Sequence, residues 1–459
     1  MLGRDVVERR IGELLGGEPC GGRALLVEGP IGVGRTTTLR LIADRAVERG
    51  YAVLSATGSR AERSVPLGVA RQMVGPRSPD PVTGVPRAPD DRVLQFESVT
   101  ADLLGRVGDH AGPLMFVLDD LQLADPESLE LLLYLLRRVP PRSVVLVAAV
   151  QTPQSAAADS AAFLAEVSRT LRLDRLRLDR LSPDEVREHL AARLGGERVE
   201  ELAHEAVALS GGSPLLLDAL VEDLVHGAAS GSERYARAVV AGVHRGGPVV
   251  TEVAAALAVL AETSAAADPS TGEVAQVAGV TREAAEAALV TLAEAGLPTG
   301  PGYPVTAARD AVLDRIGPAR RADMHLAAAQ VAREAGRPVS VVVEHLLAAG
   351  DRCRADVPWA VDALVEAADR AVLDQEPEHA ARCLQVAWHH CPAGRESTPR
   401  GPARRRAVAG PAARVAAPAR GGAPAGGGRP RRGGGGAAAG VARPDGGGRR
   451  AALRPRTGR

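Results

Sequence analysis

Short apolar runs alternate with helical patterns in the first third of the chain, which predicts a parallel sheet with crossover helices. The runs contain almost no polar residues, and this is typical of strands buried on both faces. The expected strands are residues 24–27, 52–55, 114–118 and 144–149. From about residue 182 apolar residues recur at helical spacing instead. The chain is therefore expected to be α/β first and all-helical afterwards, to about residue 395.

A glycine-rich loop follows the first expected strand and precedes a helical pattern that begins at Thr38. This is the context of a nucleotide P-loop, whose glycines let successive backbone amides face a phosphate at a helix N-terminus. A chance glycine-rich turn is the alternative, and the position between strand and helix favours phosphate binding. The expected phosphate-binding residues are Gly29, Gly32, Val33, Gly34, Arg35, Thr36 and Thr37.

The P-loop pattern is met except at its lysine, where the chain has Arg35. Arginine keeps the positive charge, but its planar guanidinium is bulkier than an ammonium group, so the exchange is not conservative. Thr36 occupies the position whose hydroxyl would bind Mg²⁺.

Two carboxylates, Asp119 and Asp120, end the third expected strand. Ligands of open α/β sheets bind at the carboxyl ends of strands. Asp119 is suited to hold Mg²⁺ through water, and Asp120 to polarise an attacking water as the catalytic residue. A solvated acidic turn would be the simpler explanation of either residue alone. Together with the P-loop, the pair favours an ATP or GTP site.

The net charge of zero is the sum of two unlike parts. Residues 401–459 contain 14 Arg and one acid, Asp445, which gives +13, and the remaining 42 basic and 55 acidic residues give −13. Of those 59 C-terminal residues, 53 are Arg, Gly, Pro or Ala, which cannot bury enough apolar surface to fold. We therefore expect a disordered tail over residues 396–459.

Four cysteines are too few for a disulfide framework and indicate a reducing compartment. The first ten residues lack the apolar core of a signal peptide, and no apolar stretch is long enough to span a membrane. The expectation is a cytoplasmic protein with no membrane partner.

Five segments follow one another along the chain in an order that is specific when all five are taken together. They are Leu2-Gly3-Arg4, the P-loop, and residues 62–72, 119–129 and 211–217. Over about residues 1–395 this series resembles the N-terminal half of the large ATP-binding transcription regulators of the LuxR type. These are signal-transducing ATPases of the STAND class, related to AAA+ proteins. The resemblance adds two residues to the nucleotide site, Arg4 and Pro214, the latter in a Gly-x-Pro motif with Gly212.

The resemblance also implies an order of domains. A P-loop NTPase domain would span residues 1–175, a helical lid 176–245 and a winged-helix domain 246–335, and TPR-like helical repeats would begin over 336–395. ATP and ADP, with Mg²⁺, would switch the protein between closed and open forms, with nucleotide-dependent self-association. A small-molecule or protein inducer would bind the repeats, and DNA would be read by a C-terminal domain absent from this chain.

Three positions depart from the family pattern. Arg35 replaces the P-loop lysine, the chain reads Val150-Gln151-Thr152 where relatives usually have an arginine that senses the γ-phosphate, and Val305 aligns with a winged-helix histidine. Each removes a charge or donor from the phosphate environment, where such groups stabilise the transition state. Nucleotide binding is therefore expected to survive better than hydrolysis, leaving at most a weak ATPase.

Several histidines and cysteines invite a metal interpretation. The spacing of Cys383, His389, His390 and Cys391 fits no common zinc site, so a helix end with incidental ligand types is expected. His325 and His345 lie in helical patterns and are expected to be packing residues.

The tail leaves two interpretations open. An Arg-rich segment binds nucleic acid phosphates, which would suit a stand-alone AAA+-like ATPase similar to origin-recognition ATPases. The other is a frameshift near residue 395 in a GC-rich gene, which we favour because the helical pattern stops abruptly and the tail has no aromatic residue to stack on bases.

Overall fold

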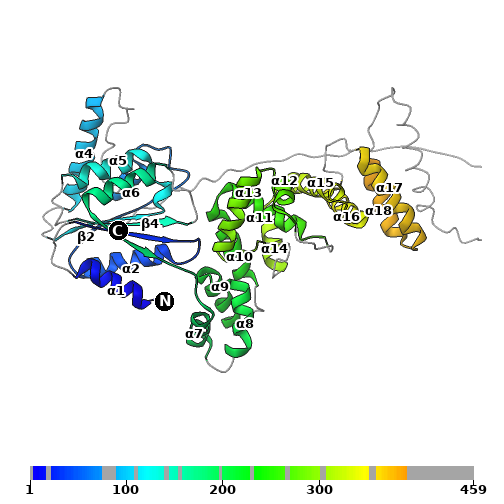
Figure 1. Ribbon diagram of the computed structural model, residues 1–459, viewed down its shortest axis with the longest axis horizontal. Coiled ribbons are helices and arrows are strands. Elements are labelled where there is room, and N and C mark those ends of the chain that lie inside the picture. The colour runs from blue at the N-terminus through cyan, green and yellow to red at the C-terminus, as the bar shows by residue number, and fades with distance from the viewer. Residues whose placement is uncertain are drawn as a thin grey trace, which may run out of the picture. The chain divides into compact units, whose positions relative to one another are not determined.

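A five-stranded sheet forms the N-terminal part of the computed structural model (Figure 1). The structure describes residues 4–16, 22–74, 89–107, 112–138, 144–152, 158–195, 199–227, 232–263, 269–299, 306–350 and 358–389. The strands are β1 (Arg23–Gly29), β2 (Ala52–Thr57), β3 (Leu114–Asp119), β4 (Val144–Gln151) and β5 (Arg172–Arg177). Their order is β2-β3-β4-β1-β5 and every pairing is parallel. The α/β prediction and its four strands are confirmed.

The edge strand β5 was not predicted from the sequence. Its residues, Arg-Leu-Asp-Arg-Leu-Arg, are mostly polar, and only Leu176 is buried. An edge strand has a single neighbour, here β1, and needs no continuous apolar run. Because β5 continues to Arg177, the sheet extends past the expected domain end at residue 175.

Helices cover both faces of the sheet (Figure 1). Alternate side chains explain this, since Leu25 and Val27 of β1 face one core, and Ala24 and Leu26 face the other. The first core is completed by α1 (Arg4–Leu15) and α2 (Arg35–Glu48). The second is completed by α3 (Gly68–Val74), α4 (Pro89–Val107), α5 (Pro126–Leu136) and α6 (Ala158–Thr170). The sheet is thereby buried on both sides.

The chain after β5 is helical throughout its described residues, as expected. The first group is α7 (Pro183–Leu194), α8 (Val199–Ser210), α9 (Pro214–Val225) and α10 (Glu233–Gly246). The second is α11 (Pro248–Leu260), α12 (Thr271–Ala278), α13 (Arg282–Glu294), α14 (Thr306–Leu313) and α15 (Pro318–Glu334). The last is α16 (Val339–Ala349), α17 (Pro358–Leu373) and α18 (Pro377–His389).

Helix ends in this part follow local sequence signals. Ser182 and Glu185 form a reciprocal capping box at the start of α7, as Ser270 and Glu273 do at the start of α12. Gly279 ends α12 with φ of 72°, a left-handed conformation that glycine adopts without strain. α12, the turn at Gly279 and α13 therefore follow one another as helix, turn and helix, whereas the winged-helix assignment of residues 246–335 stays a prediction.

The tail from residue 396 lies outside the described residues. In the part of the chain that is described, no helix has the length and apolar character needed to cross a membrane.

Candidate nucleotide site

The glycine-rich loop joins β1, the strand between β4 and β5, to the helix α2. Gly32 and Gly34 have φ of 78° and 102°, values that favour glycine. Gly29 is glycine for a different reason, because an added Cβ would lie 2.7 Å from the carbonyl oxygen of Leu178. The space around Gly34 is open, with nothing within 4 Å of an added Cβ. The loop thus has the backbone turns and the open approach that a phosphate group requires.

Arg35 points back across the loop instead of into open space. Its Nη1 donates to the carbonyl oxygen of Gly29 at 3.1 Å, and its Nη2 lies 3.3 Å from Oδ1 of Asp120. Only 10% of the side chain is exposed. Burial lowers the pKa of the guanidinium, Asp120 and Asp119 act in the opposite direction, and nearby Arg245 adds to the lowering. The charge of Arg35 is therefore already partnered by Asp120.

Thr36 and Asp119 form the part of the site that fits a magnesium ion. The Thr36 hydroxyl donates to Oδ2 of Asp119 at 2.6 Å, so two hard oxygen donors lie side by side. Asp119 ends β3 and is 8% exposed. The donor set and the open loop beside it fit Mg²⁺ with a nucleotide phosphate, and these two residues would hold the metal.

Asp120 is held in place by its own backbone and by two neighbours. Its φ of 46° is unusual for a residue other than glycine, and its amide donates to Oδ1 of Asp119 at 2.9 Å. Besides Arg35, the Nε2 of Gln122 donates to Asp120 Oδ1 at 3.1 Å. The carboxylate expected to polarise water is thus oriented by two donors.

Gln151 lies at the end of β4, beside this group. Its backbone amide donates to Oε1 of Gln122 at 3.2 Å, and its side chain is buried, at 3% exposure. The Nε2 of Gln151 has no hydrogen-bond partner within the described chain. A buried donor without a partner is costly unless a ligand or water satisfies it.

The helix α9 contacts the glycine-rich loop from the other side. The amide of Leu215 donates to the carbonyl oxygen of Gly32 at 3.2 Å, and Pro214 is the first residue of α9. Ile31 of the loop belongs to the same hydrophobic core as Leu216. The structure therefore places the Gly-x-Pro segment on the P-loop.

Gly212, the first residue of that segment, is required sterically. Its φ is 77°, and an added Cβ would lie 2.4 Å from the carbonyl oxygen of Leu181. Its own carbonyl accepts from the amide of Leu181 at 2.8 Å. The start of α9 is thus fixed against the chain segment that leaves β5.

For the other residues expected at the nucleotide site, the structure gives exposure or position along the chain. Val33 is buried at 8% exposure and Thr37 is exposed in the first turn of α2. Arg4 begins α1, but its side chain lies outside the described part of the chain. Val305 lies outside it as well. The nucleotide roles of all these residues stay predictions.

Three residues near the site were not singled out from the sequence. Gln122 donates to Asp120, and Arg245 adds to the lowering of the Arg35 pKa that burial causes. The third, Asp125, is 1% exposed and accepts from the amides of Leu67, Val69 and Ser128 at 2.9, 3.0 and 2.9 Å. It fixes the segment before α3 to the loop that carries Asp119 and Asp120. A Pro following Asp125 was the available signal, as it marks an N-cap.

The metal interpretations outside this site gain no support. Cys383 is fully buried in the core of the last helices, and burial raises the pKa of its thiol. Among the described residues no group of three or more His, Cys, Asp or Glu side chains could hold a metal ion. The His389 side chain, His390 and Cys391 lie outside them.

A parallel sheet, a glycine-rich loop leading into α2, and paired acids at the end of β3 define a P-loop nucleotide-binding module. Residues 2–147 match the family model described as the AAA ATPase domain. The chain therefore carries an AAA+ ATPase module in its N-terminal part. No curated protein matches the chain's sequence.

Solved structures resemble the chain at low identity. The ORC2 protein of Aeropyrum pernix is 15% identical, with 68% of this chain and 94% of that one covered and a TM-score of 0.37. A STAND protein with a tetratricopeptide repeat sensor from Pyrococcus horikoshii is 13% identical, with 83% and 57% covered and a TM-score of 0.27. The chain thus spans little more than half of that STAND protein. A RuvB variant of Thermotoga maritima is 15% identical, with 62% and 87% covered and a TM-score of 0.35. At these sequence identities and TM-scores, the functions of the solved proteins are not assigned to this chain.

Proposed function

We propose that the chain is the nucleotide-dependent switch of a LuxR-type transcription regulator, which binds ATP and ADP with Mg²⁺ and hydrolyses ATP slowly or not at all. The observation that carries this proposal is the contact between Arg35 and Asp120 beside the Thr36–Asp119 pair. The glycine-rich loop would bind phosphate and the Thr36–Asp119 oxygens would hold Mg²⁺, but Arg35 and Asp120, the expected P-loop cation and catalytic carboxylate, pair with each other. Such a site favours binding over turnover.

The nucleotide would be bound by the backbone of residues 29–34 and by the N-terminus of α2. Thr36 and Asp119 would hold Mg²⁺, which neutralises phosphate charge when bound. Arg35 would exchange Asp120 for a phosphate oxygen, and Gln151 Nε2 is a buried donor at the end of β4 that has no partner among the described residues. Because α9 touches Gly32 directly, a nucleotide in the loop would act on the helices that follow.

The test is a titration of the full chain with fluorescent ATP and ADP, with and without Mg²⁺, together with a phosphate-release assay. We expect both nucleotides to bind and turnover to stay at least ~100-fold below the ~10 s⁻¹ of a median enzyme. If neither nucleotide binds at millimolar concentration, the proposal is wrong. If ATP is hydrolysed at a rate near the median value, the proposed slow hydrolysis is wrong.

A second candidate, a stand-alone AAA+-like ATPase that acts on nucleic acid, is favoured by one observation, the 14 arginines of residues 401–459. Such a segment binds phosphates without sequence preference, and the binding weakens steeply with salt. A gel-shift assay with and without residues 401–459 separates the two. Tail-dependent and salt-sensitive binding to unrelated sequences supports the second candidate, and no binding supports the first.

A further inference from the structure

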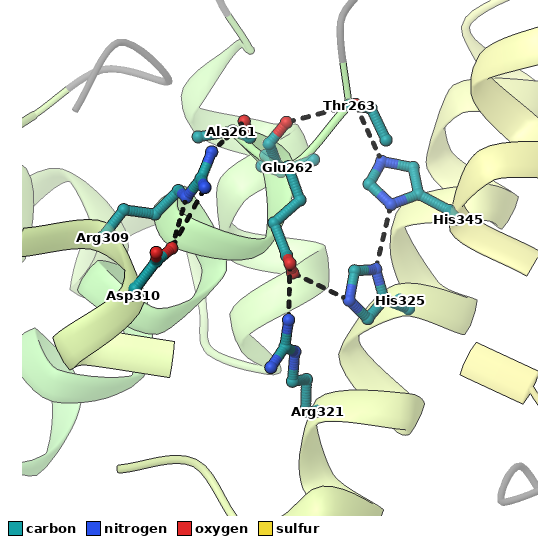
Figure 2. Close-up of polar contacts among 9 residues, drawn as sticks. Ala261, Glu262, Thr263, Arg309, Asp310, Arg321, His325 and His345 are labelled. Atoms are coloured by element: carbon teal, nitrogen blue, oxygen red, sulfur yellow. Dashed lines mark hydrogen bonds and ion pairs between the residues drawn. The ribbon is translucent and has the colours of Figure 1, made fainter. Parts of the chain in front are cut away.

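Two buried histidines meet at the junction of α11, α15 and α16, apart from the nucleotide site (Figure 2). His325 of α15 and His345 of α16 are each 1% exposed, and their Nδ1 atoms lie 3.1 Å apart. On its other side His325 Nε2 lies 3.0 Å from Oε2 of Glu262, just after α11. Nothing in the proposed nucleotide switch uses this cluster.

The chemistry of the donors limits where protons can lie. A carboxylate only accepts, and a bare ring nitrogen 3.0 Å from its Oε2 would be repelled by it, so His325 carries a hydrogen on Nε2 although the two atoms fall short of hydrogen-bond geometry. Only one hydrogen fits between the two facing Nδ1 atoms. The direction of the His325–His345 bond therefore decides whether His325 is neutral or a cation.

Thr263 completes two self-consistent arrangements. Its hydroxyl oxygen lies 3.4 Å from His345 Nε2 and 3.2 Å from the carbonyl oxygen of Leu260. When the hydroxyl donates to His345, His345 donates to His325 and both rings are neutral. When it donates to Leu260 instead, His345 Nε2 donates to Thr263, and His325, with hydrogens on both nitrogens, is a cation paired with Glu262. The cluster thus has room for one added proton.

A second added proton has no place. Both Nδ1 atoms would carry hydrogens that point at each other, and two cationic rings would lie 5.4 Å apart. In agreement, burial and then His325 lower the pKa of His345 to about 4, with Glu262 opposing them. The limit is set by geometry as well as by charge.

The charged groups around the cluster come from three further positions. Arg321 of α15 pairs with Glu262, and His325 and Arg321 together keep the pKa of that carboxyl below its usual value against the effect of burial. Arg309 of α14 pairs with its neighbour Asp310 and donates to the Ala261 carbonyl. Toward α17 and α18, α16 packs in an apolar core.

We propose that His325 and His345 form a proton-operated joint between α15 and α16, which holds one proton and opens when a second is added. The joint lies where two cores meet on α15, since Met324 and Ala328 belong to the core that α8–α15 share, and Ala329 and Ala332 to that of α15–α18. Opening would separate α16, α17 and α18, where the TPR-like repeats are expected to begin, from the helices that precede them. The inference does not rest on the nucleotide function.

The direction of the pH dependence follows from linkage. In the unfolded or opened state, His345 has the ordinary His pKa of 6.5. In the closed joint its pKa is lowered to about 4. The stability that the joint contributes is complete above pH 6.5 and is lost as the pH falls from 6.5 toward 4.

Trp359 provides a probe across this junction, because the guanidinium of Arg333 on α15 lies 4.7 Å from its ring centroid on α17. The full chain with W388F leaves Trp359 as the single tryptophan. We expect its emission to change in a one-proton transition between pH 6.5 and 4, while far-UV ellipticity stays constant.

Three further variants decide the matter. H345Q should abolish the transition, and H325Q should move its midpoint upward toward 6.5, because the neighbouring cation is gone. H204Q, at an exposed position on α8, should leave it unchanged. The proposal is overturned if Trp359 emission stays flat, if ellipticity falls together with it, or if the transition survives in H345Q. Should H345Q not fold, an unshifted midpoint in H325Q overturns it alone.

Discussion

Arg35 Nη2 lies 3.3 Å from Asp120 Oδ1. The cation that follows the glycine-rich loop is therefore paired directly with the carboxylate that follows β3. The Arg35 side chain is 10% exposed and that of Asp120 is 32% exposed. A lysine ammonium is a compact charge on a flexible stem, whereas the guanidinium can bind a carboxylate and a carbonyl at once. Arg35 does this with Asp120 and Gly29.

Replacing Asp120 by Asn should strengthen ATP binding. The substitution removes one negative charge beside the phosphates and frees Arg35 to pair with them, so we expect about three- to tenfold tighter binding, equivalent to about 1 kcal/mol. Any residual hydrolysis should fall. Calorimetric titration with ATP measures the first effect, and D44N, on the exposed side of α2, is the matched control. Weaker ATP binding by D120N would contradict the arrangement proposed.

Replacing Asp119 by Asn should remove the effect of Mg²⁺ on nucleotide affinity. In the native chain we expect Mg²⁺ to tighten ATP binding by about tenfold, because Thr36 and Asp119 would hold the metal and its charge would offset that of the phosphates. In D119N the affinities measured in Mg²⁺ and in EDTA should be nearly equal. D44N should keep the native difference. If D119N keeps it too, the metal is not bound by Asp119.

Replacing Asp125 by Ala should destabilise the N-terminal part by about 3 kcal/mol. The substitution leaves three amides without their acceptor, and one of them belongs to Leu67, whose φ of 58° is costly for that residue. Urea unfolding followed by circular dichroism measures the loss. D159A removes an exposed carboxylate and should change the stability by less than about 0.5 kcal/mol. Equal effects of the two variants would refute the role of Asp125.

Gly212→Ala and Gly227→Ala separate steric conflict from backbone strain. Both glycines have a left-handed φ, 77° and 72°, but an added Cβ meets Leu181 only at Gly212. We expect G227A to cost about 1 kcal/mol and G212A clearly more, about 3 kcal/mol. Only G212A should also weaken nucleotide binding, because α9 is displaced from Gly32. Thermal unfolding and ATP titration of both variants provide the comparison, and identical behaviour of the pair would count against the contact.

Much of the N-terminal α/β part could be predicted from the sequence for local reasons. Continuous apolar runs mark strands buried on two faces, and a glycine-rich loop between strand and helix marks a phosphate site, because both signals lie within a few neighbouring residues. The edge strand β5 carries no such signal, since its exposed positions hold Arg and Asp. The order of strands could not be read either, because it depends on which runs pair.

The sequence by itself determined the α/β start, the glycine-rich loop and the two acids at the end of the third strand. Only the tertiary structure decided that Arg35 reaches Asp120, that the amide of Leu215 donates to Gly32, and that the Nδ1 atoms of His325 and His345 lie 3.1 Å apart. Each of these contacts joins residues distant along the chain, so their side chains meet only after the sheet and the helices have packed. Local pattern fixes which element a residue occupies, whereas packing fixes what it touches.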